Sequence, residues 1–278
     1  MLLLKQILPA VAVAMMVAAG FCSLALLLAK ERARRLGPVA VGLAYCAGHF
    51  VVTGWVTFPP TDTTNWLPYF ALGAAALGAT WEWARWNSGI RVLLFALVTA
   101  GALRLLLKPK FQYSWSLGQG WLWLAGLVLA IVFLAVVVDL LAQRTTRPIA
   151  LPAYLLIVCA GTVGALMLSG SMLLGQLATA LAAAIFGTLV LTMRGIALSR
   201  SIAPVFSLLL GGLLISGYFF AALPATSAVF LIVAPVLALV PVGKAATFWS
   251  FLARAGLVSL PVAAAVVLAF RASPPLDY

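Results

Sequence analysis

The chain has 278 residues, of which 65% are hydrophobic and 8% charged. A soluble domain is about half apolar and about one quarter charged, so the composition excludes that class and predicts a protein dissolved in lipid. The net charge of +12 would suggest nucleic-acid binding in a soluble chain. Here the basic residues lie in short gaps between apolar runs, as membrane topology signals do, so we expect the lipid bilayer and no nucleic acid as a partner.

The apolar runs are continuous rather than alternating, which favours membrane-spanning helices over a β-barrel. A spanning helix needs roughly 20 residues. Runs of about that length cover residues 4–29, 38–58, 67–85, 90–107, 121–142, 150–169, 171–193, 203–222, 226–242 and 252–270. We therefore predict an all-α, polytopic membrane helix bundle with about ten transmembrane helices, in a single transmembrane domain over residues 1–278.

Some connections between these runs are informative. The run 4–29 is longer than the apolar part of a signal peptide, and basic residues follow it from Lys30, so we expect a retained helix; a cleaved signal peptide stays the alternative. Ser169-Gly170-Ser171 predicts a tight helical hairpin. The outer gap from Lys108 to Gly120 has the Pro and Gly content of turns.

Basic residues are distributed unequally between alternate gaps. Twelve of the 17 Lys and Arg side chains fall on one side and five on the other. The positive-inside rule places the richer side in the cytoplasm, so both termini are expected to be non-cytoplasmic. We expect a multi-pass protein of a bacterial cytoplasmic (inner) membrane.

Several residues recur about 165 positions apart. Pro59 and Thr61, for example, recur as Pro224 and Thr226. One interpretation is a weak parallel repeat that relates residues 1–110 to 170–278, as in some transporters. The other is that turns collect Pro and helix ends collect Arg in any membrane protein.

The strongest site candidate is a polar stripe on the second run. His49, the one histidine in the chain, lies near the predicted midplane, and Tyr45, Thr53 and Thr57 lie at helical steps of four from it. Polar groups in hydrocarbon are costly unless they face the bundle interior or water, so the stripe should face inward. It predicts a substrate path or a proton relay; the alternative is a histidine that hydrogen-bonds a neighbouring helix.

Weaker candidates are a mixed set. Glu82 and Asp139 are acidic residues near predicted inner helix ends, where interfacial pairing is the simpler explanation. Arg104 lies at an outer end, where it anchors the helix or attracts an anion. Pro235 and Pro261 interrupt the last two runs, and such breaks free carbonyl groups that transporters use for coordination.

Recognised catalytic and ligand motifs are absent from the sequence. It contains no zinc-protease, P-loop or hydrolase-elbow motif. Cys22, Cys46 and Cys159 lie in apolar runs without a paired spacing, so we expect no metal site and no cofactor.

Three functions remain. The first is a small permease-like transporter that moves a small solute or lipid along the polar stripe of the second run, here named the helix-two stripe. The second is a non-catalytic subunit or assembly factor that binds other membrane subunits. The third is a membrane-embedded enzyme, although five acids and one histidine leave few groups for acid–base chemistry.

Overall fold

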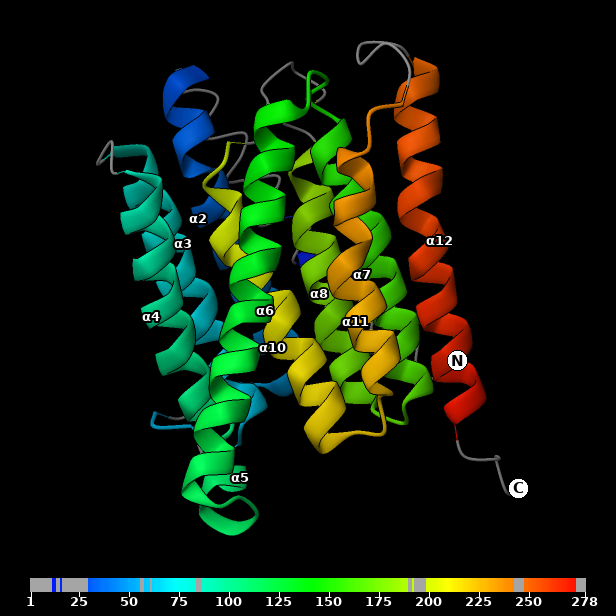
Figure 1. Ribbon diagram of the computed structural model, residues 1–278. Helices are drawn as coiled ribbons and strands as arrows, with labels where there is room; N and C mark the ends of the chain where they lie inside the picture. The colour runs from blue at the N-terminus through cyan, green and yellow to red at the C-terminus, as the bar shows by residue number, and fades with distance from the viewer. Residues whose placement is uncertain are drawn as a thin grey trace.

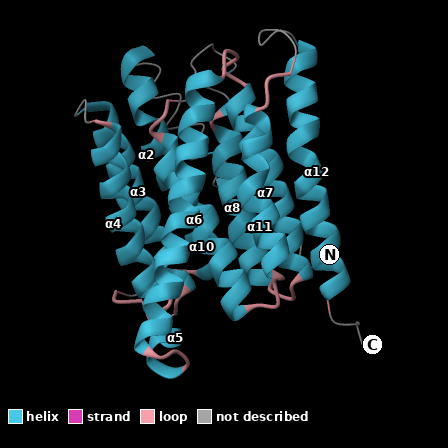
Figure 2. Ribbon diagram, viewed as in Figure 1, coloured by secondary structure: helices cyan, strands magenta, loops and turns pink. Residues whose placement is uncertain are grey.

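The structure is a computed structural model that describes residues 30–55, 58–60, 62–83, 87–189, 199–242 and 248–273, with the isolated residues 12, 13, 16 and 192. It does not describe the side chains of residues 30–36, 82 and 83. Within these ranges the chain forms helices joined by turns, without a strand (Figure 2). The all-α prediction is confirmed for this part, and the run 4–29 lies almost wholly outside it.

The observed helices follow the predicted runs closely from residue 67 onward. In chain order the elements are α2 (Lys30–Thr53), η1 (Thr64–Trp66), α3 (Leu67–Trp83), α4 (Ser88–Leu106), α5 (Lys108–Tyr113), α6 (Leu117–Arg144), α7 (Ala150–Leu168), α8 (Met172–Gly187), α10 (Ile202–Phe220), α11 (Ala225–Val233), η2 (Ala234–Leu239) and α12 (Phe248–Ala272).

Glycines with positive φ end two of the helices. Gly54 adopts a φ of +79°, and its N–H donates to the carbonyl of Phe50 at 2.9 Å, so α2 stops at Thr53 rather than near residue 58 as predicted. Gly170 has a φ of +84° between α7 and α8. The predicted hairpin at Ser169-Gly170-Ser171 is therefore confirmed.

Proline changes the local structure at two further places. The segment predicted as turns after Lys108 contains the short helix α5, with Pro109 in its first turn, where the fixed φ of proline suits a helix start. Near Pro235 the ninth run changes from the α-helix α11 to the 3-10 helix η2, because proline has no N–H to donate along an α-helix.

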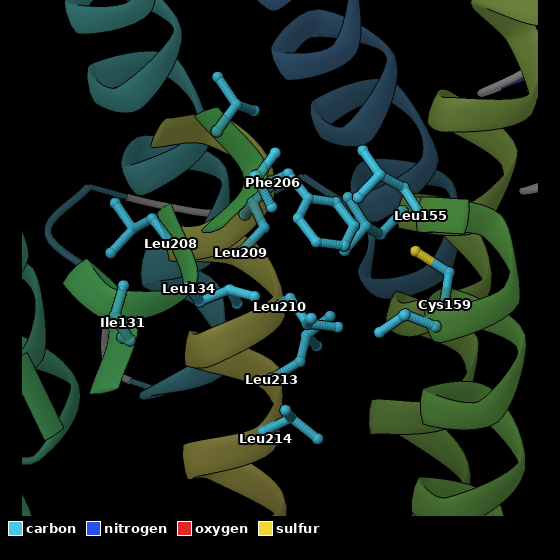
Figure 3. Close-up of a cluster of buried hydrophobic side chains, with 14 of the residues drawn as sticks. Ile131, Leu134, Leu155, Cys159, Phe206, Leu208, Leu209, Leu210, Leu213 and Leu214 are labelled. Atoms are coloured by element: carbon cyan, nitrogen blue, oxygen red, sulfur yellow. The ribbon is translucent and has the colours of Figure 1, made fainter. Parts of the chain in front are cut away.

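Helix α10 forms the centre of the bundle. It packs against α3 and α6 and also contacts α2, α7 and α8. Figure 3 shows α10 side chains between Ile131 of α6 on one side and Leu155 and Cys159 of α7 on the other. Gly211 permits this approach, since an added Cβ would lie 2.5 Å from the Ile131 side chain.

Five described helices are long and apolar enough to cross a membrane: α4, α6, α7, α10 and α12. Three shorter apolar helices cover Gly37–Thr53, Met172–Gly187 and Ala225–Leu239. In the spanning window of α10, 89% of residues are buried, against 28% in α4 and 22% in α12. Helices α4 and α12 occupy opposite edges of the bundle (Figure 1). Long apolar helices with apolar outer faces indicate a membrane protein.

Candidate functional site

Two of the four residues of the helix-two stripe are fully buried in the bundle. His49 and Tyr45 are both 0% exposed, and their ring centroids lie 5.9 Å apart. The Thr53 hydroxyl donates to the carbonyl of His49 at 3.0 Å, which satisfies it within its own helix. Thr57 lies outside the described residues.

The polar atoms of this stripe have few partners in the described part of the chain. Among the described groups, no hydrogen bond of good geometry is formed by either ring nitrogen of His49 or by the Tyr45 hydroxyl. The Asn65 side chain interacts with the imidazole. His49 is not among the lining residues of three cavities that described residues form.

A larger polar feature lies where α4 packs on α6. A cavity of about 320 Å³, here named the α4–α6 cavity, combines charged side chains with apolar ones. Small-molecule sites have volumes of about 300–1,000 Å³. Its lining residues are Trp81, Ser88, Arg91, Val92, Phe95, Val132, Ala135, Val136, Asp139, Leu140, Gln143 and Arg200.

A bidentate ion pair lies among the residues that line the cavity. Arg200 donates from Nε to Asp139 Oδ1 and from Nη2 to Asp139 Oδ2, both at 2.6 Å. Gln143, one turn along α6, donates to Oδ2 at 2.9 Å. The planar guanidinium matches the carboxylate, so the pair holds the start of α10 against α6. The partner of Asp139 thus lies 61 positions away in the sequence.

Two donors in this cavity lack a partner among the described groups. They are the buried Nε of Arg91, in the first turn of α4, and the indole N–H of Trp81, near the end of α3. Trp81 is only 6% exposed, and its ring meets Phe95 edge to face at 6.3 Å. Buried donors without acceptors cost free energy, so a ligand that brings acceptors would relieve that cost.

The exposed lining residues of the cavity are apolar on the helix flanks and polar near the helix ends, where Ser88 and Gln143 are exposed. Val92 and Val136 both line the cavity and are 37% exposed. In a membrane protein, exposed apolar side chains on the flank of a helix bundle face lipid. The arrangement can therefore accept a molecule with one polar and one apolar part.

The weaker candidates occupy separate places. Glu82 belongs to α3, but its side chain is outside the described set. The Arg104 guanidinium lies 4.0 Å from the centre of the Phe111 ring, a cation–π contact that suits an interfacial anchor. Pro235 lies in the first turn of η2, whereas Pro261 lies within an uninterrupted α12.

A second cavity, of about 260 Å³, lies at the other end of α4. Lys108 is the charged side chain among its described lining residues, and prolines Pro59, Pro60 and Pro109 form much of its wall. It lacks the combination of acid, guanidinium and unpartnered donors that marks the α4–α6 cavity.

Sequence patterns did not single out Arg91, Arg200, Trp81 or Gln143. The arginines resemble topology signals, and Trp81 resembles an interfacial anchor. One signal was present: Asp139 and Gln143 lie four residues apart near the end of an apolar run, so they share a helix face. Nothing in the sequence indicates that Arg200 and Arg91 join that face.

No protein-family model matches the chain, and neither a curated protein nor a solved structure matches it significantly.

Proposed function

We propose that this chain is a multi-pass, permease-like membrane protein that moves an amphipathic molecule or a lipid across a membrane. The observation that supports the proposal is the α4–α6 cavity, which places charged and hydrogen-bonding groups beside exposed apolar side chains of α4 and α6. The polar part of an amphipathic substrate would enter the cavity while its apolar part stays in lipid.

The position of the opening favours a lipid-like substrate over a fully water-soluble one. Val92 and Val136 offer apolar contact to acyl chains, while the exposed side chains of Ser88 and Gln143 can hydrogen-bond a polar headgroup. The helix-two stripe remains a second proposed path, through His49, Tyr45, Thr53 and Thr57. The α4–α6 cavity takes precedence because it offers measurable space.

We further propose the orientation that the basic residues predict. The ends of the bundle that carry Arg91, Arg144 and Arg200 would then face the cytoplasm of a bacterium, and both termini would face outward. A cysteine placed at Asp62 should react with an impermeant reagent added outside the cell, in a background without the native cysteines. Reaction only from the cytoplasmic side would contradict this orientation.

Transbilayer movement of labelled lipids tests the function. The full chain would be reconstituted into phosphatidylcholine vesicles that carry a trace of fluorescent phosphatidylglycerol or phosphatidylcholine, and dithionite would bleach the outer leaflet. We expect the protein to accelerate bleaching of the inner-leaflet label. Val136→Trp, which fills the opening, should return the rate to that of protein-free vesicles.

Leu129→Trp is the matched control, because Leu129 is 68% exposed and lies two turns away on the same face of α6, outside the cavity lining. This variant should keep the full rate. Absence of acceleration with either lipid, or equal loss in both variants, would contradict the proposal.

A non-catalytic subunit of a larger membrane complex is the second candidate. The observation in its favour is the exposed apolar surface of α4, where Leu93 and Leu97 are 60% and 61% exposed. A partner helix would cover that surface as well as lipid does. Co-purification of a second membrane protein at fixed stoichiometry from the native host, lost on Leu97→Arg, would favour this candidate.

An enzyme is not proposed. Acid–base chemistry would gain support if His49 and Asp139 shared one site. The α4–α6 cavity instead joins Asp139 to Arg200 and Gln143, and His49 is not among its lining residues.

A further inference from the structure

We infer that the α4–α6 cavity binds a phosphoryl oxyanion, with Arg91 as its cationic partner and Trp81 as a neutral donor. The inference rests on the proposed function, since it names the chemical class of the polar group that would enter the cavity. The phosphodiester of a lipid headgroup and free inorganic phosphate share this chemistry.

The charges that line the cavity leave one net positive charge. Among its described lining residues, the charged side chains are Arg91, Arg200 and Asp139. Asp139 and Arg200 form a bidentate pair and neutralise each other. Among the described lining residues, Arg91 therefore carries the charge without a described counter-ion, which attracts an anion in a site partly shielded from water.

The Arg91 side chain has hydrogen-bond donors for which the described part of the chain provides no acceptor. Its side chain forms no hydrogen bond or ion pair with another described residue, and its Nε is buried. A guanidinium has five donors and no acceptor, and its planar fork binds two oxygens of a phosphoryl group at once. An oxyanion in the cavity would satisfy these donors together with the charge.

Neighbouring groups on α3 and α4 add donors of the same kind. The Trp81 indole can only donate, and it is buried in the same cavity without a partner among described residues. Ser88 lines the cavity at the first residue of α4, where backbone N–H groups lack helical partners and carry partial positive charge. These donors converge on the space from two helices.

This arrangement favours a phosphoryl group over a carboxylate. A carboxylate has two oxygens in one plane, and a single arginine fork satisfies both. A phosphoryl group has further oxygens pointing in other directions, which can accept from Trp81 or Ser88 while Arg91 binds the first two. The exposed apolar side chain of Val136 suits the acyl chains of a phospholipid.

Lipid binding to the full-length protein in detergent, measured by native mass spectrometry, tests the inference. The probes are phosphatidylglycerol, diacylglycerol with the same acyl chains, and inorganic phosphate as a competitor. Wild-type protein should bind phosphatidylglycerol and not diacylglycerol. Arg91→Gln should weaken binding about tenfold or more, because it removes charge-assisted hydrogen bonds.

Three further variants keep the result interpretable. Arg91→Lys, which keeps the charge but loses the fork, should bind with intermediate affinity. Trp81→Phe, which keeps the ring but loses the N–H, should weaken binding several-fold. Arg104→Gln makes the same charge change on the same helix outside the cavity and should leave binding unchanged.

The competition arm separates the two sources of the phosphoryl group. Displacement of phosphatidylglycerol by inorganic phosphate would show that free phosphate suffices; no displacement, with binding still dependent on Arg91, would assign the site to a lipid headgroup. Equal binding of diacylglycerol, or wild-type affinity in both Arg91 variants, would overturn the inference.

The outcomes also separate the inference from the proposed function. Lipid movement that Val136→Trp blocks but Arg91→Gln leaves intact would refute the oxyanion site alone. Arg91-dependent binding without any lipid movement would refute transport and leave the site standing.

Discussion

The centre of the bundle and its α4–α6 edge treat polar groups in opposite ways. In the interior of the bundle, His49 and Tyr45 are fully buried, and neither lines the α4–α6 cavity or the cavity at the other end of α4. At the edge, Asp139 and Arg200 satisfy each other, and Arg91 and Trp81 line a cavity of about 320 Å³. The single histidine is therefore buried among other side chains, whereas Arg91 and Arg200 line a cavity.

The contrast shows that polarity within a membrane helix is a weak guide to a binding site. A polar side chain in hydrocarbon must be enclosed or paired whether or not it binds anything. A site needs room beside the polar group, and room depends on how neighbouring helices pack.

The largest expected effect would sharpen the difference in packing. Phe206 of α10 is 0% exposed, so Phe206→Ala should lower the free energy of unfolding by about 3 kcal/mol. This value is near the lower limit for buried Phe→Ala, because lipid rather than water solvates helices that separate in a membrane. Phe133→Ala removes the same side chain from an exposed position on α6 and should cost under about 1 kcal/mol. Denaturant titration in detergent measures both, and similar losses would mean that the centre is not the tighter region.

The second prediction breaks the ion pair at the edge. Asp139→Asn should lower the free energy of unfolding by about 1.5 kcal/mol, the low end for hydrogen bonds to charged groups, because the Arg200 side chain is 34% exposed and partly screened. It should also tighten phosphatidylglycerol binding several-fold, since the described lining of the cavity loses its negatively charged side chain.

The double variant Asp139→Asn/Arg200→Gln is the control for this experiment. It should recover part of the stability and remove the gain in binding. Unchanged lipid affinity in Asp139→Asn would mean that the pair does not set the charge of the cavity.

The smallest effect concerns His49. His49→Ala should cost about 1 kcal/mol of stability, in the range of interhelical polar contacts, and should leave lipid movement at the wild-type rate. His49→Leu should be more stable than His49→Gln, because neither ring nitrogen of His49 has a hydrogen-bond partner of good geometry among the described groups. Loss of lipid movement in a folded His49→Ala protein would return the substrate path to the helix-two stripe.

Much of the fold could be predicted from local patterns. The runs from residue 67 onward match the observed helices because a long apolar stretch has few alternatives to a helix in lipid. The end of α2 was missed, since the left-handed Gly54 stops the helix inside an apolar run. Five described helices meet the length and hydropathy of a span, so the proposed ten rest on the sequence.

The candidate site could be predicted only in part. Asp139 stood out because an acid near hydrocarbon needs a partner, but its partner lies 61 residues away. Trp81 and Arg91 looked like interfacial anchors, and their unpartnered donors are visible only once α3, α4 and α6 are packed together.

By itself the sequence determined that this chain belongs in lipid and where most of its helices run, because both follow from hydrophobicity summed over neighbouring residues. Only the tertiary structure decided that His49 is enclosed and that Arg91, Asp139 and Arg200 meet at one cavity. Those contacts join residues far apart in the chain, so they depend on the rotation and spacing of packed helices, which no local pattern encodes.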